Sequence, residues 1–451
     1  MVHTALLIQG GRILDPAQDL DLIGDLLVDN GQVLWIRPSG SASHLPTAYE
    51  MVDARGLLVT PGFVDLHCHL REPGFEHKET IATGTRAAAK GGFTTVCSMP
   101  NTEPAVDTAA LVDYVTKRAN ETAIVRVLPI GCITRGRAGT QLAEMVEMAQ
   151  AGAVAFSDDG DPVGNAHLMR QALSYSQITG LPVINHCEDK TISQGGVMNQ
   201  GVVASRLGLR GTPPAAEEAM VARDIALAEL TGGKLHLAHL STAGSVALVE
   251  RAKERGIPIT AEVTPHHLVL TEEWVLGYQG ASRGWLSTPL YDTSTKVNPP
   301  LRTTADVEAL RRGLKNWVID AIATDHAPHA RLDKLSTYDD AAFGISGLET
   351  ALGLLMTTIH EGDLDLSTLI RRITTAPAVI LGRPVGNLRD NTSADITIIK
   401  PDQEWIVDPK SFVGMGQNTP LGGMRLKGKV VATMFGGDFV HNELDVKTVH
   451  Q

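Results

Sequence analysis

From about residue 61 onward, short apolar runs alternate along the chain with longer segments whose apolar residues recur at helical spacing. Most of the longer segments, such as TIATGTRAAAKGG and AALVDYVTKRAN, end in Gly or Asn, as helices commonly do. Apolar strands that alternate with helices are typical of a parallel sheet, and eight such units predict a (β/α)8 TIM-type barrel. The predicted strands are 63–70, 94–101, 125–133, 153–160, 182–188, 235–241, 257–268 and 319–329.

Both ends of the chain have a different pattern. Residues 1–58 alternate short apolar runs with Gly-Gly, Asn-Gly and Arg-Gly pairs, which predicts strands joined by turns. Residues 381–451 return to such strands in ADITIIKP, EWIV and RLKGKVVATMFGG. We therefore expect an α/β protein in which a barrel over 59–380 stands beside a small β domain built from both chain ends.

Composition narrows the class of function. The 451 residues are 43% hydrophobic and 20% charged, which is enough apolar content for a large core. The net charge of −12 and the 4% aromatic content argue against nucleic acid or an anionic membrane as a partner. The first residues lack a signal-peptide pattern, no apolar run reaches about 20 residues, and the four cysteines form no CxxC pair. These features predict a cytoplasmic protein with reduced thiols.

Polar side chains gather where the predicted strands end. A barrel enzyme builds its active site at this rim, from the ends of different strands. Six of the eight strand ends contribute, with His67, His69, Arg71, Asn101, Asp158, Asp159, His186, His239, Asp325, His326 and His329.

The pair His67 and His69 indicates a metal site. Residues two apart on a strand face the same way, so both imidazoles point into the barrel mouth while Cys68 points away. Two neutral imidazoles bind one divalent ion at about 2.0–2.1 Å each. His186 and His239 offer two more imidazoles at later strand ends.

Carboxylates at the rim extend this hypothesis. An aspartate after the fourth strand, either Asp158 or Asp159, has two oxygens with which to bridge two metals. Asp325 could ligate a metal, take a proton from metal-activated water and return it to a leaving nitrogen. Its alternative role is to cap the following helix, although the cluster ATDHAPH favours a functional one.

Several longer motifs resemble those of the type I dihydroorotases, zinc-dependent members of the amidohydrolase superfamily. The resemblance covers nearly the whole chain and rests on motifs that are far more specific than HxH alone. They are HCHLREPG (67–74), SMPNTEP (98–104), FSDDG (156–160), NHCED (185–189), HLAHLST (236–242), TPHHL (264–268), KVNPPLR (296–302), ATDHAPH (323–329) and AFGISGLET (342–350).

This resemblance implies reversible cyclisation of N-carbamoyl-L-aspartate to L-dihydroorotate in pyrimidine synthesis, with a metal-bound hydroxide as nucleophile and Asp325 as general acid and base. A homo-oligomer is the expectation, and some type I relatives associate with aspartate transcarbamoylase, but the residues themselves leave both the oligomeric state and this partner open. The implied zinc ligands are His67, His69, Asp159, His186, His239 and Asp325. The implied substrate contacts are His69, Arg71, Asn101, Asn298, His329, Phe343 and Gly344.

Arg71 and the residues at the end of the fourth predicted strand distinguish a dihydroorotase from an allantoinase or a hydantoinase. Arg71 would grip the carboxylate of dihydroorotate with two parallel hydrogen bonds, a contact that allantoinases and hydantoinases do not need. Many of those relatives bridge two metals with a lysine after strand 4, where this chain has FSDDG. The alignment of that motif favours Asp159 and leaves one or two zinc ions open. A catalytically inactive scaffold is a further alternative, opposed by the complete ligand set.

Two regions of the sequence leave their roles undecided. The stretch 330–350 ends in Gly-rich AFGISGLET, which suits either a mobile lid with Gly344 and Gly347 as flexible points or a static rim loop. The pair His266 and His267 has no assigned role.

Overall fold

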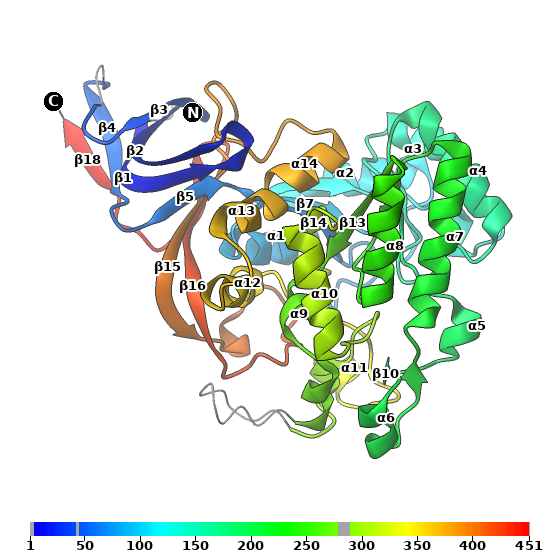
Figure 1. The fold of residues 1–451 in the computed structure, drawn as a ribbon. Helices are drawn as coiled ribbons and strands as arrows, with labels where there is room; N and C mark the ends of the chain where they lie inside the picture. The colour runs from blue at the N-terminus through cyan, green and yellow to red at the C-terminus, as the bar shows by residue number, and fades with distance from the viewer. Residues whose placement is uncertain (1–3, 42–44, 278–288, 451) are drawn as a thin grey trace.

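The computed structural model describes residues 4–41, 45–277 and 289–450. A set of parallel strands surrounded by helices lies beside a sheet that contains strands from both ends of the chain (Figure 1). No helix among these residues is long and apolar enough to cross a membrane. All four cysteines fall in the described ranges, and each is buried and unpaired.

Seven of the eight predicted barrel runs contain a strand, and all neighbouring strands pair in parallel. The run 153–160 contributes a single residue, Phe156, which bridges Gly131 on one side and Val183 on the other. A parallel bridge from Cys68 to His326 joins the last strand to the first, so the pairings form a ring. The strands are β6 (Phe63–Cys68), β7 (Phe93–Ser98), β8 (Arg126–Pro129), β9 (Val183–Asn185), β12 (Leu235–Leu237), β13 (Ile259–Val263) and β14 (Ala321–Ile322).

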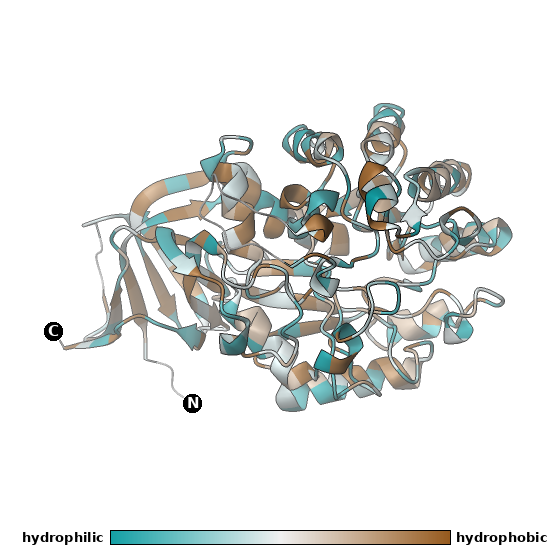
Figure 2. Ribbon diagram, turned by 90° about the horizontal axis from the view of Figure 1, so that it is seen from below, coloured by the Kyte–Doolittle hydropathy of each residue, from teal (hydrophilic) through white to brown (hydrophobic). Residues whose placement is uncertain are grey.

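Helices connect these strands and pack outside them. Figure 1 shows α4, α7, α8 and α10 following one another around the ring, and in Figure 2 the helices carry both apolar and polar stretches, as expected with one face buried. The longer helices are α1 (Ile81–Lys90), α2 (Ala109–Thr122), α4 (Ala166–Thr179), α7 (Ala215–Thr231), α8 (Ala243–Glu254), α10 (Thr304–Lys315), α12 (Ala351–His360) and α13 (Leu366–Ile373). The shorter ones are α3 (Met145–Gln150), α5 (Lys190–Ser193), α6 (Val202–Leu207), α9 (Pro265–Val269), α11 (Arg331–Lys334) and α14 (Thr375–Leu381).

One predicted strand ends earlier than expected. The run 257–268 is a strand only to Val263, and its last part is helix α9. The Thr264 hydroxyl accepts the backbone N–H of His267, and Pro265 occupies the first turn. A Thr cap followed by Pro is a strong signal for the start of a helix, and it outweighs the apolar run that surrounds it.

The chain ends form one sheet with the order β17-β16-β15-β5-β1-β2-β3, in which β4 pairs with β1 and β18 pairs with β4. Strand β5 joins the two halves because it pairs with β1 on one side and β15 on the other. This strand passes residue 58, the predicted boundary of the N-terminal segment. The strands are β1 (Leu6–Asp15), β2 (Leu20–Asp29), β3 (Gln32–Pro38), β4 (Ala48–Asp53), β5 (Leu58–Pro61), β15 (Ile396–Ile406), β16 (Arg425–Phe435), β17 (Asp438–Asn442) and β18 (Lys447–His450). A separate small pair consists of β10 (Met198–Asn199) and β11 (Gly211–Thr212).

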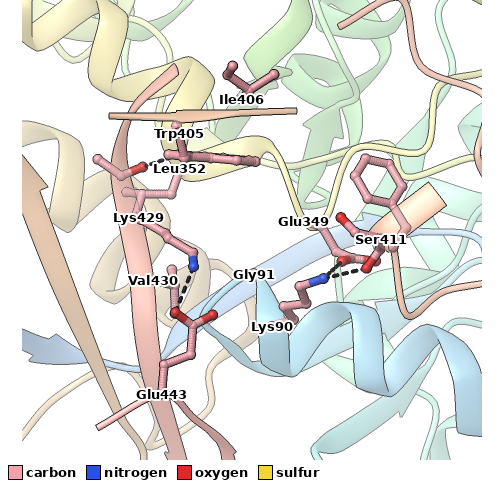
Figure 3. Close-up of a pocket in the computed structure, with 13 residues that line it drawn as sticks. Lys90, Gly91, Glu349, Leu352, Trp405, Ile406, Ser411, Lys429, Val430 and Glu443 are labelled. Carbon is pink, nitrogen blue, oxygen red and sulfur yellow. Dashed lines mark hydrogen bonds and ion pairs between the residues drawn. The ribbon is translucent and has the colours of Figure 1, made fainter. Parts of the chain in front are cut away.

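A cavity of about 270 Å³ lies where α1 and α12 face β15 and β16 (Figure 3). Lys90 Nζ is 2.9 Å from Glu349 Oε2 and donates to the carbonyl of Ser411 at 2.7 Å. Lys429 Nζ donates to Glu443 Oε2 at 2.6 Å. Each of the four charged side chains that line the cavity therefore has a partner of opposite charge in its wall.

Candidate metal centre and substrate pocket

Four imidazoles and two carboxylates meet at the carboxyl ends of the ring strands. All six side chains are buried, and each comes from the end of a strand or, for Asp159, from just after the Phe156 bridge. Two groups of possible ligand atoms each lie within 4.8 Å of one another, one made by His67, Asp159 and His239 and the other by His67, His69 and Asp325. The whole set is His67, His69, Asp159, His186, His239 and Asp325.

Asp159 is the centre of this cluster. Its Oδ1 lies 3.2 Å from Nε2 of His67, 3.7 Å from Nε2 of His239 and 4.0 Å from Nδ1 of His186. Its Oδ2 lies 3.5 Å from Nε2 of His69. The two oxygens thus face different imidazoles, which is the arrangement that a carboxylate shared by two cations requires.

Asp158, the other candidate, points elsewhere. Its carboxylate accepts the backbone N–H groups of Ile133 and Thr134 at 2.8 and 3.0 Å, together with the Thr134 hydroxyl. Burial raises the pKa of Asp158 to about 6, although these hydrogen bonds oppose the rise. Asp158 is therefore a buried structural acceptor, and only its neighbour faces the imidazoles.

Asp325 completes the cluster from the opposite side. Its Oδ1 lies 3.0 Å from Nε2 of His69 and 3.6 Å from Nε2 of His67. Asp325, Arg71 and His239 all have left-handed backbones, with φ of 45°, 62° and 33°. Such backbones are costly for residues other than Gly, and they concentrate at functional sites that the surrounding structure holds in place.

The electrostatics of the cluster suit a cation. Burial by itself would raise the pKa values of Asp159 and Asp325, but hydrogen bonds and charge from the surrounding imidazoles hold both below the usual range. Nε2 of His67 is buried, faces both carboxylates and has no hydrogen-bond partner among the residues that the structure describes. A polar nitrogen without a hydrogen bond beside two ionised carboxylates is what a divalent metal ion would satisfy, so the residues present fit such an ion.

Glu262, in the middle of β13, orients the cluster from behind. Its Oε1 lies 2.9 Å from Nδ1 of His67, and its Oε2 lies 3.0 Å from Nε2 of His236. Burial would raise the pKa of Glu262, but the two imidazoles overcome this and hold it at about 2. Glu262 was not among the residues predicted from the sequence. Its only signal was a lone acid inside an apolar strand.

A cavity of about 320 Å³ opens beside the cluster. All the residues predicted to contact substrate line it, together with Gly160, Lys190 and Ala327, which the sequence motifs did not single out. The remaining lining residues are His69, Arg71, Asn101, Asp159, His186, His239, Asn298, Asp325, His329, Phe343 and Gly344.

Arg71 is a half-buried cation in this cavity. Its Nε donates to the carbonyl of Pro328 at 3.2 Å, and Nη2 lies 3.4 Å from Nε2 of His329. Burial lowers the pKa of Arg71 to about 10, so the side chain stays charged at neutral pH. The guanidinium has five N–H donors, and those left after these contacts remain for an anionic ligand.

Two asparagines tie the cavity wall to the cluster. Asn101 Oδ1 accepts from Nδ1 of His69 at 2.9 Å, which leaves Nε2 of that ring to face the carboxylates. Asn298 Nδ2 donates to Glu188 Oε2 at 3.0 Å and lies 3.2 Å from Nε2 of His186. The side chains that would touch a ligand therefore also orient the imidazoles.

Three further histidines near the rim do not line the cavity. His326, predicted as a rim residue, accepts the N–H of Gly347 through Nδ1 at 3.1 Å. His267 bonds through Nε2 to the carbonyl of Pro299 at 3.0 Å, and His266 beside it is also buried. His326 and His267 hold backbone segments behind the site.

Comparison with known sequences points to one family. A family model described as dihydro-orotase-like matches residues 56–245. A curated dihydroorotase of Pelotomaculum thermopropionicum is 52% identical over 437 residues, which cover 96% of this chain and 98% of that protein. A curated dihydroorotase of Syntrophus aciditrophicus is 47% identical over 438 residues, covering 97% and 99%.

Solved structures with the same fold carry other names. An L-hydantoinase (dihydropyrimidinase) from Arthrobacter aurescens superposes with a TM-score of 0.85 at 26% identity, over 100% of this chain and 98% of that one. A dihydropyrimidinase from Brevibacillus agri gives 0.82 at 20% identity, over 97% and 95%. At 20% identity a likeness shows the fold alone, so the more similar sequences decide the family.

Proposed function

The chain belongs to the dihydroorotase family and is a hydrolase that acts on a cyclic amide bond, and we propose that it interconverts N-carbamoyl-L-aspartate and L-dihydroorotate with zinc at the described cluster. We further propose that its ring of strands is the closed (β/α)8 barrel of a type I member. The parallel pairings that run around the ring support this proposal.

One observation carries the proposal: Asp159 lies within 4.0 Å of all four imidazoles, and Arg71 lines the same cavity. The cluster offers imidazole and carboxylate ligands, the set that zinc prefers when thiolates are absent. The ligands proposed are His67, His69, Asp159, His186, His239 and Asp325. Zinc bound there would polarise the scissile carbonyl and make a water nucleophilic near neutral pH.

The chain's own residues supply orientation. Arg71 binds the free carboxylate of dihydroorotate, and Asn101 supports this contact from the next strand end. Asn298 offers a donor and an acceptor to the amide edge of the ring. His329 and the backbone of Phe343 and Gly344 close the other side of the cavity. Together these contacts hold the scissile carbonyl against the cluster.

Asp325 moves the proton. During ring opening its carboxylate accepts a proton from the attacking water and delivers it to the nitrogen that leaves the carbonyl carbon. During ring closure it takes the proton from the ureido nitrogen as that nitrogen attacks the carboxyl carbon, and it gives this proton to the departing oxygen. The low pKa of Asp325 keeps it in the accepting form at neutral pH.

The main alternative is a hydantoinase-like activity, because the superposed structures bear that name. Two features argue against it. The cluster contains an aspartate where many such enzymes have a lysine, and Arg71 places a positive charge in the cavity where an uncharged ring would need none. A substrate with a carboxylate fits this cavity better.

A direct assay tests the proposal. Purified protein with its zinc quantified is given L-dihydroorotate and N-carbamoyl-L-aspartate at neutral and mildly acidic pH, with allantoin and dihydrouracil as controls. We expect interconversion of the first pair and its loss in Asp325→Ala. Turnover of allantoin or dihydrouracil alone would indicate a different amidohydrolase activity. Absence of turnover in folded, zinc-loaded protein would contradict the proposed reaction.

A further inference from the structure

Lys334, the last residue of α11, carries a buried ammonium group that bonds to backbone carbonyls beside the substrate cavity. It is 8% exposed, and it does not itself line the cavity that holds Arg71. Its Nζ donates to three backbone carbonyls, those of Thr293 at 3.1 Å, Lys296 at 3.4 Å and Ala342 at 2.6 Å. An ammonium has three N–H donors, so all of them are engaged.

The three carbonyls belong to two segments that carry cavity residues. Ala342 directly precedes Phe343 and Gly344, which line the cavity, and Lys296 lies two residues before Asn298, which lines it as well. The Gly344 N–H donates to the carbonyl of Lys296 at 2.9 Å, so the two segments also bond to each other. Lys334 sits at their junction.

A second lysine strengthens the same junction. The Nζ of Lys296 donates to the carbonyl of Asp339 at 2.8 Å and lies 4.4 Å from the centre of the Phe343 ring. The Thr293 hydroxyl in turn donates to the carbonyl of Lys334 at 2.7 Å. The segments 293–298 and 334–344 are thus connected in both directions, as a fixed rim loop requires.

We propose that Lys334 is a positioning residue, whose ammonium sets the backbone of 293–298 and 342–344 and thereby the places of Asn298, Phe343 and Gly344 in the substrate cavity. An apolar side chain of the same length would remove a charged donor from all three carbonyls. Those of Thr293 and Lys296 each keep one backbone N–H donor, from Lys296 and Gly344, so the contact to Ala342 would be lost most completely and the two segments would loosen there. The inference rests on the proposed function for the identity of the substrate, but the backbone contacts themselves do not depend on it.

Lys334→Met tests the proposal, with Lys253→Met as the matched control. Lys253 is also partly buried, and its Nζ binds Asp320 and the carbonyl of Trp317, away from the cavity. In Lys334→Met we expect KM for L-dihydroorotate to rise about tenfold, the scale of one hydrogen bond to a charged group, while kcat changes by less than about twofold. Lys253→Met keeps the wild-type KM.

Hydrogen exchange followed by mass spectrometry gives a readout without substrate. Peptides that cover 335–347 exchange faster in Lys334→Met and unchanged in Lys253→Met. If Lys334→Met does not fold, Lys334→Gln replaces it, because the amide keeps two donors. Wild-type KM and wild-type exchange in a folded variant would overturn the proposal, as would a fall in kcat at constant KM. Failure of the wild type to turn over L-dihydroorotate would refute the proposed function and leave the exchange result to decide on Lys334.

Discussion

The Nδ1 atom of His67 lies 2.9 Å from Oε1 of Glu262, while Nε2 of the same ring lies 3.2 Å from Asp159. The carboxylate on one edge of the imidazole therefore directs the other edge into the cluster. Hydrogen bonds of this kind fix the tautomer of a metal-binding histidine and raise its basicity. Glu262 also bonds Nε2 of His236, whose Nδ1 faces the Thr260 hydroxyl rather than the cluster, so one buried acid orders two rings.

Replacing Glu262 should weaken metal binding, although all six proposed metal ligands remain in place. Gln has the same shape as Glu but offers one acceptor oxygen to two imidazoles. We expect Glu262→Gln to lower zinc affinity about 10- to 100-fold, the usual cost of removing a partner behind a ligand. Zinc retention against a series of chelators measures this. Asp25→Asn, a buried acid in the β sheet that accepts from Gly10, is the control. Equal retention in both variants would contradict the role of Glu262.

Substitutions of the adjacent Asp158 and Asp159 should have different effects, one on the free energy of unfolding and the other on metal binding. Asp159→Asn removes the carboxylate shared by the imidazoles, so we expect fewer bound zinc ions per chain and loss of turnover. Asp158→Asn should keep the zinc content, because Asp158 binds only the segment at Ile133 and Thr134. Its cost should be about 1–3 kcal/mol in the free energy of unfolding, from weakened buried hydrogen bonds. Metal analysis and urea denaturation of both variants measure these effects, and zinc loss in Asp158→Asn would reverse the assignment.

The sequence predicted most of this site because its residues follow a simple rule. Parallel strands end at the same edge, so the polar groups that follow six of the eight apolar runs were expected to meet there. The rule failed where a run scarcely forms a strand. Residues 153–160 pair only through Phe156, and side-chain alternation therefore could not choose between Asp158 and Asp159. The motif alignment favoured Asp159, the one that faces the imidazoles.

Residues behind the site were beyond the reach of the sequence. Glu262 lies within a strand and Lys334 in a polar stretch, and nothing local shows that one meets two histidines and the other three carbonyls. Their partners are distant in sequence, so only the folded chain brings them together. The sequence also could not decide whether the loop after Asp325 is a lid or a fixed rim, which depends on these same contacts.

Arg71 should be needed for a high kcat/KM because L-dihydroorotate carries a negatively charged carboxylate. Lysine cannot reproduce two parallel hydrogen bonds to a carboxylate. We expect Arg71→Lys to lower kcat/KM for L-dihydroorotate roughly 10- to 100-fold, as for a loss of about 1.5–3 kcal/mol. The methyl ester of dihydroorotate lacks the charge, so any turnover of it should change much less. Arg118→Lys, which affects a pair with Glu72 outside the cavity, is the control. An equal loss of kcat/KM for both compounds would contradict the proposed contact between Arg71 and the carboxylate.

Gly344 and Gly347 should respond differently to Ala. Gly344 has a φ of +140°, and an added Cβ would lie 2.7 Å from Cβ of Ala327 and 2.8 Å from its carbonyl oxygen. At Gly347 the nearest atom would be 3.6 Å away. We expect Gly344→Ala to cost about 1–3 kcal/mol in unfolding free energy through strain and overpacking, and to raise KM. Gly347→Ala should do neither. Equal behaviour of the two variants would indicate that the rim loop adapts freely.

The buried ammonium of Lys334 should make stability depend on pH in a predictable direction. Burial lowers its pKa to about 7, the charge of Lys296 adds to this effect, and Asp292 and Asp333 oppose it. In the unfolded chain a lysine has a pKa of about 10.4. Between these values the unfolded chain binds more protons than the folded one, so the free energy of unfolding rises with pH. Below pH 7 both states hold the proton and this contribution is flat.

Comparison of wild type with Lys334→Met isolates that contribution, because all other titrating groups are shared. The free energy of unfolding of the wild type relative to the variant should increase from pH 7 to pH 10 by up to about 4 kcal/mol, the upper limit set by a pKa difference of about three units. Urea denaturation at pH 6, 8 and 9.5 measures it. Lys315→Met, at an exposed position on α10, controls for the loss of one positive charge. A constant difference between wild type and Lys334→Met across this range would mean that the three carbonyls keep the ammonium fully protonated in the folded chain.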